Sequence, residues 1–138
     1  MAQVFAGFVV GYALALVLGP AAAITIVANN RRTGFAQRIA PPGTNVIALS
    51  VVLHVAGIIV LTMVGLVLGM VLAGLDARRP EEGLGSPNLA YTLIVVALTA
   101  VLVIPALAVP AVRRWVAVAG VVFVLCFGWA LPWLAELG

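Results

Sequence analysis

Four long apolar stretches constrain the fold of this chain more than any other feature. They cover approximately residues 4–28, 46–74, 91–112 and 115–136. About 20 helical residues cross a hydrocarbon core of roughly 30 Å, so each stretch is long enough to span a membrane. Only 8% of the 138 residues are charged, whereas a soluble domain carries about a quarter. The sequence therefore predicts an all-α membrane protein. We expect a four-transmembrane-helix bundle, up-down-up-down with short connections, that forms a single integral membrane domain over residues 1–138.

The basic residues indicate how this bundle is oriented. Five of the seven arginines fall in the first and third connections: Arg31, Arg32, Arg38, Arg113 and Arg114. Basic residues gather on the cytoplasmic side of membrane proteins. We therefore expect a multi-pass plasma-membrane protein whose connections 29–45 and 113–114 are cytoplasmic and whose N- and C-termini lie outside. In these positions the arginines set topology and meet lipid headgroups, and no nucleic-acid partner is expected.

Small residues recur along the first two stretches in the pattern of a glycine zipper. The first carries them at every fourth position, and the second has its own set: Gly7, Gly11, Ala15, Gly19, Ala23, Gly57, Gly65 and Gly69. Lipid tails are as apolar as leucine, so close backbone approach along small residues is what holds membrane helices together. These residues favour helix packing within the bundle. A homo-oligomer interface and thinning of the backbone beside a ligand or pore are the alternatives.

Two prolines inside the stretches, Pro20 and Pro105, predict helix kinks, because proline removes a backbone hydrogen bond. Pro110 is expected to end the third helix.

His54 is the residue whose chemical role the sequence leaves open. It lies about eight residues, or roughly 12 Å, inside the second stretch, with Ser50 one turn earlier on the same face. A polar group at this depth normally faces protein or a water cavity. The imidazole either forms a hydrogen bond with a nearby side chain, acts as a relay in a polar cavity, or serves as an axial ligand to haem or another metal. In the first case its partner is Ser50 or a threonine at position 25, 62, 92 or 99.

Catalysis and metal binding have little support in the pattern. Asp76 follows His54 by 22 residues, about 33 Å of helix, which excludes a Ser–His–Asp triad with Ser50 in this hairpin. No metal-ligand spacing occurs, and a haem held by two histidines needs a second protomer or a partner, because the chain has one histidine. We therefore predict no catalytic residue, no metal site and no cofactor, and expect no enzyme activity within a single chain.

The sequence favours a non-catalytic accessory, structural or self-associating membrane subunit. The first alternative is a homo-oligomeric small transporter or channel in which His54 lines a polar path. The second is a haem- or quinone-associated redox subunit that uses His54. The expected partners are the lipid bilayer and either further copies of the chain or a larger membrane complex. Arginine as the sole basic residue, with heavy use of Ala, Val, Gly and Leu, is typical of a GC-rich prokaryote.

Overall fold

The computed structural model describes residues 1–33, 41–43, 45–77, 89–108 and 113–137, and all regular structure in these ranges is helical. The helices are α1 (Ala2–Thr33), α3 (Val46–Asp76), α4 (Leu89–Leu107), α5 (Arg113–Leu125), the π-helix η1 (Cys126–Ala130) and α6 (Leu131–Glu136). Four helical runs in these ranges are long and apolar enough to cross a membrane: Ala2–Ala28, Val46–Leu75, Leu89–Leu107 and Arg113–Glu136. The prediction of an all-helical chain with four membrane-length helices is confirmed.

Local chemistry explains where α3 and α4 end. Asn45 caps α3, because its side-chain oxygen accepts a hydrogen bond of 2.9 Å from the backbone N–H of Ile47. The third helix was predicted to run to residue 112, but α4 ends at Leu107. The N–H of Ala108 donates to the carbonyl of Pro105 at 3.2 Å, which closes the helix with a three-residue turn. Pro110, which was expected to end this helix, lies outside the described residues.

The fourth run contains a wide turn that the sequence analysis missed. In η1, the N–H of Leu131 donates to the carbonyl of Cys126, five residues earlier instead of four. Pro132 follows directly. Its ring would collide with the carbonyl of Gly128 in a regular α-helix and it has no N–H to offer that carbonyl. The π-turn widens the helix just before the proline and so accommodates it.

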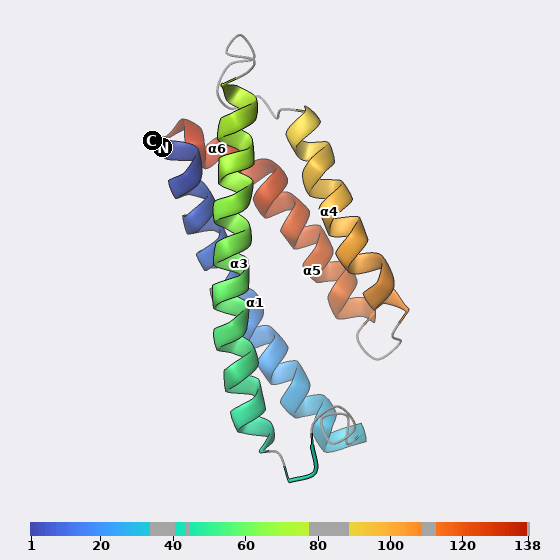
Figure 1. Ribbon diagram of the computed structural model, residues 1–138. Helices are drawn as coiled ribbons and strands as arrows, with labels where there is room; N and C mark the ends of the chain where they lie inside the picture. Colours follow the sequence, from blue (N-terminus) through green and yellow to red (C-terminus); the bar gives the residue numbers. More distant parts are fainter. Residues whose placement is uncertain (34–40, 44, 78–88, 109–112, 138) are drawn as a thin grey trace.

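The helices form two pairs, α1 with α3 and α4 with α5 (Figure 1). Both ends of the chain lie at the same end of the molecule, where η1 and α6 pack against α1. α3 and α4 make far fewer contacts with each other than α1 does with α3. The two pairs are therefore joined mainly through α1 and the C-terminal helices.

The core lies at the end of the molecule that carries the two termini, which we call the closed half. Its buried residues are Ala6, Val10, Leu14, Leu68, Leu72, Tyr91, Val95, Phe123, Phe127, Leu131 and Ala135. The rings of Phe123 and Phe127 pack with centroids 4.5 Å apart.

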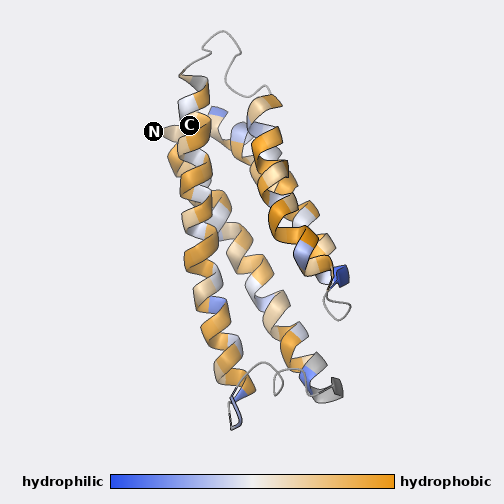
Figure 2. Ribbon diagram, turned by 45° about the vertical axis from the view of Figure 1, so that its right-hand side comes forward, coloured by the Kyte–Doolittle hydropathy of each residue, from blue (hydrophilic) through white to orange (hydrophobic). Residues whose placement is uncertain are grey.

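The other end is the open half: residues 18–30, 46–61, 100–108 and 113–122. Ser50 and Gly120 are the buried residues among those described there. Away from the termini the helix pairs diverge, and apolar residues cover the outside of all the helices (Figures 1 and 2).

Candidate functional site

α1 and α3 touch backbone to backbone in the closed half. A Cβ added at Gly65 would overlap the carbonyl oxygen of Gly7 and lie 3.1 Å from the Cα of Gly11. A Cβ added at Gly69 would lie 2.9 Å from the Cα of Val4. Because the obstructing atoms belong to the backbone, a side chain at these positions requires the helices to move apart. Glycine is therefore required here by the close approach of the two helices.

The remaining small residues mark where this contact ends. Ala15 is only 1% exposed and belongs to the same interface. Gly19, one turn further on, faces the side chain of His54 instead of the α3 backbone. Nothing lies within 4 Å of a Cβ added at Gly57, although the sequence predicted this residue on the packing face. Gly57 and Ala23 instead line a cavity.

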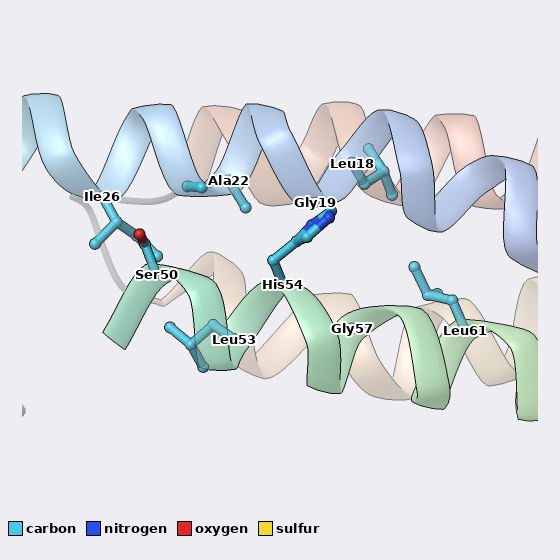
Figure 3. Close-up of a pocket in the computed structure, with 10 residues that line it drawn as sticks. Leu18, Gly19, Ala22, Ile26, Ser50, Leu53, His54, Gly57 and Leu61 are labelled. Atoms are coloured by element: carbon cyan, nitrogen blue, oxygen red, sulfur yellow. The ribbon is translucent and has the colours of Figure 1, made fainter. Parts of the chain in front are cut away.

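That cavity, which we call the His54 cavity, has a volume of about 180 Å³ and lies between α1 and α3. Figure 3 shows the imidazole of His54 crossing from α3 towards Gly19 on α1. A Cβ at Gly19 would overlap Nδ1 and Cε1 of the ring. Gly19 therefore forms a notch for the imidazole, and Ser50 and Ile26 lie further along the cavity wall.

The hydrogen bond considered between Ser50 and His54 does not form. The Ser50 hydroxyl donates to the carbonyl of Ile47 at 2.8 Å, within its own helix. Nδ1 of His54 is buried and has no hydrogen-bond partner among the described residues. Leaving a buried polar group unsatisfied typically costs about 1–3 kcal/mol. The imidazole is thus the polar group of this cavity that has unused hydrogen-bonding capacity.

The threonines considered as partners of His54 do not line its cavity. Thr25 and Thr99 donate to the carbonyls of Ala21 and Val95, four residues earlier, each at 2.7 Å. The hydroxyls of Thr62 and Thr92 are buried without a partner in the described part of the chain.

No group of three His, Cys, Asp or Glu residues that could hold a metal ion occurs within the described ranges. Ligation of a haem by two histidines would need a histidine from another chain, because this chain has only His54.

Two further cavities involve α4 and α5. One, of about 250 Å³, lies between the two helix pairs and shares Leu18 and Leu61 with the His54 cavity. The other, of about 470 Å³, runs between α4 and α5, and we call it the α4–α5 groove. These two share Thr99, Val103 and Gly120 as walls. The cavity between the helix pairs thus shares a wall with each of the other two.

The predicted kinks and lipid contacts fall at exposed positions. α1 continues through Pro20 and α4 continues through Pro105, with both rings exposed. Arg113 and Arg114 are exposed at the start of α5. The backbone of Arg31 and Arg32 belongs to α1, but their side chains lie outside what the structure describes, as does the whole of Arg38.

Sequence reasoning missed both cavities beyond the His54 cavity, because they depend on how the two pairs sit against each other. Comparison with protein-family models, with curated proteins and with solved structures gives no match. The function of the chain has to be inferred from its own residues.

Proposed function

We propose that this chain is a four-span, up-down-up-down integral membrane protein that acts as a non-catalytic accessory or self-associating subunit. Its short connections 29–45 and 113–114 are placed in the cytoplasm and its termini outside, by the excess of arginine in those connections. The exposed apolar side chains along each long helix support the membrane placement, since lipid tails are their natural solvent.

The observation that carries the subunit role is the backbone contact between α1 and α3. Gly7, Gly11, Gly65 and Gly69 bring these two helices together along the closed half. Ser50 and Thr99, which are buried, donate their hydroxyls to carbonyls of their own helices and so have no hydrogen left to offer a substrate. Backbone packing of this kind builds a rigid helix pair, which suits a scaffold for assembly better than turnover of a substrate.

The test is to extract the protein gently into nanodiscs and to weigh it by native mass spectrometry, alongside co-purification from its own membranes. The proposal expects a defined complex, either with a larger membrane protein or with further copies of the chain. Repeated recovery of the monomer alone, from several mild extractions, would contradict it. Gly57→Ala should give the same complex as the unmodified protein, because nothing lies within 4 Å of the added Cβ.

A second candidate, a small transporter or channel, is favoured by the buried Nδ1 of His54 at the wall of its cavity. Polar groups at membrane depth tend to mark solute or proton paths. In proteoliposomes, His54→Ala should then abolish flux of protons or small solutes, whereas Val52→Ala, at an exposed position of the same helix that does not line the cavity, should not. Full flux through a folded His54→Ala protein would remove this residue from any path.

A further inference from the structure

The α4–α5 groove and the arginines at the start of α5 lie on one face of that helix. Arg113, Ala117, Gly120 and Val124 follow one another at steps of four, three and four residues, which places them in one line along the helix. The last three line the groove, and Arg114 is three residues before Ala117. A basic pair therefore stands at the mouth of an apolar groove.

The length of the groove matches half of a bilayer. Its α4 wall extends from Val96 to Leu107, about 17 Å at 1.5 Å per residue. On α5, the distance from Arg113 to the last lining residue, Leu125, is about 18 Å by the same measure. One leaflet of a hydrocarbon core roughly 30 Å thick is about 15 Å deep. A single chain entering at the arginines would therefore remain beside protein to the middle of the membrane.

The lining of the groove is almost entirely apolar. Thr99 is its one polar side chain, and the hydroxyl donates to the carbonyl of Val95 at 2.7 Å. The volume of about 470 Å³ falls within the roughly 300–1,000 Å³ typical of pockets that hold small molecules. An apolar ligand fits this surface, whereas a polar solute would find no partner along it.

The mouth of the groove, in contrast, attracts an anion. The first turn of α5 carries two arginines and no acidic residue, although the positive end of the helix dipole disfavours cations there. Both arginines are exposed. Glu136, at the far end of the same helical run, is about 35 Å away at 1.5 Å per residue. A phosphate at this point would neutralise the arginines and interact favourably with the positive end of the helix dipole.

We propose that the α4–α5 groove binds an anionic phospholipid, with its phosphate at Arg113 and Arg114 and one acyl chain along the groove. The ligand is an amphiphile because the site has a charged mouth and an apolar body. The proposal rests on the membrane placement given above and does not depend on the subunit role.

The experiment titrates the purified full-length protein with phosphatidylglycerol and with phosphatidylcholine of the same chain length, and counts bound lipids by native mass spectrometry. An arginine near an anionic surface contributes roughly 1 kcal/mol, or about fivefold in affinity, so the pair should give a preference of roughly 25-fold for phosphatidylglycerol. Arg113→Gln/Arg114→Gln should remove that preference. Arg113→Lys/Arg114→Lys, which keeps the charge, should retain most of it.

A second pair of variants tests the groove itself. Ala117→Phe places a ring in the groove and should abolish the bound lipid, whereas Val118→Phe, at an exposed position outside the lining, should leave it bound. Unchanged preference in the glutamine variant, or unchanged binding in Ala117→Phe, would overturn the proposal. A dimer that is lost only in Ala117→Phe would also overturn it, because a second copy would then be the occupant.

Fluorescence gives a readout that does not need a variant in the groove. With Trp129→Phe and Trp133→Phe, the remaining Trp115 lies next to Arg114 and is exposed. Phosphatidylglycerol with brominated chains should quench it more strongly than brominated phosphatidylcholine, and equal quenching would overturn the proposal. If the protein forms complexes but shows no preference for phosphatidylglycerol, only the lipid site is ruled out. If it shows that preference but forms no complex, only the subunit role is ruled out.

Discussion

Replacing Gly65 with alanine should force α1 and α3 apart at the point where their backbones touch. The new Cβ would overlap the carbonyl oxygen of Gly7, with the carbonyl carbon of Gly7 at 3.0 Å and the Cα of Gly11 at 3.1 Å. None of these atoms belongs to a flexible side chain that could turn away. The strain is therefore relieved by separation of the helices, by several tenths of an ångström at least.

The cost follows from the dispersion energy lost across the interface. A gap of about 0.5–1 Å forfeits a quarter to a half of the roughly 0.1–0.2 kcal/mol per atom pair. For an interface of about 40 atom pairs this amounts to roughly 1–4 kcal/mol. Alanine is better than glycine in a helix by about 0.5–1 kcal/mol, which offsets part of the loss. We expect the free energy of unfolding to fall by about 1–3 kcal/mol, in line with other overpacked sites.

The assay is equilibrium unfolding in mixed micelles, followed by circular dichroism as denaturing detergent is added. Gly57→Ala is the matched control, because it lies in the same helix and has nothing within 4 Å of the added Cβ. It should be neutral or stabilising by up to about 1 kcal/mol. If Gly65→Ala proves as stable as Gly57→Ala, the backbone contact does not exist as described and the reasoning is refuted.

Three further substitutions test the other close contacts. Gly19→Ala should lower the free energy of unfolding by about 1–3 kcal/mol, because the new Cβ displaces the imidazole of His54. The loss should vanish in a His54→Ala background, and an unchanged loss in the double variant would rule out the notch. A Cβ added at Gly120 is close to side chains only, with Cγ2 of Val103 at 2.9 Å as the nearest atom. Gly120→Ala should therefore lower the free energy of unfolding by less than about 1 kcal/mol in the same assay, and Val103→Ala should remove that cost. Pro132→Ala restores an N–H and should turn η1 into α-helix. Hydrogen exchange should then show that the new amide is protected, and an unprotected amide would show that the proline does not cause the wide turn.

The helices could be predicted because length and apolar composition decide them locally. The second helix begins at residue 46 in both the prediction and the structure, since Asn45 is a strong N-cap. The third helix was predicted over residues 91–112, whereas α4 covers residues 89–107, because the turn closed by Pro105 and Ala108 was not recognised. The π-turn was missed as well, although Pro132 is a visible signal for it.

The candidate site was predictable in its residues but not in its geometry. The spacing of the glycines pointed to their helix faces, and the structure indeed brings Gly7 and Gly65 together. Spacing alone cannot say how far along a helix pair the contact persists, so Gly57 was expected in a contact that it does not make. The same spacing suggested a bond between Ser50 and His54, whereas the hydroxyl is used by Ile47. Periodicity gives direction round a helix but not the distance to the next helix.

The confinement of the core to the closed half means that the two helix pairs share few buried side chains where they diverge (Figure 1). A change in the spacing of the pairs at that end would uncover little buried surface, whereas the same change beside the termini would open the packed core. The closed half is therefore the part of the molecule that fixes how the two pairs are arranged.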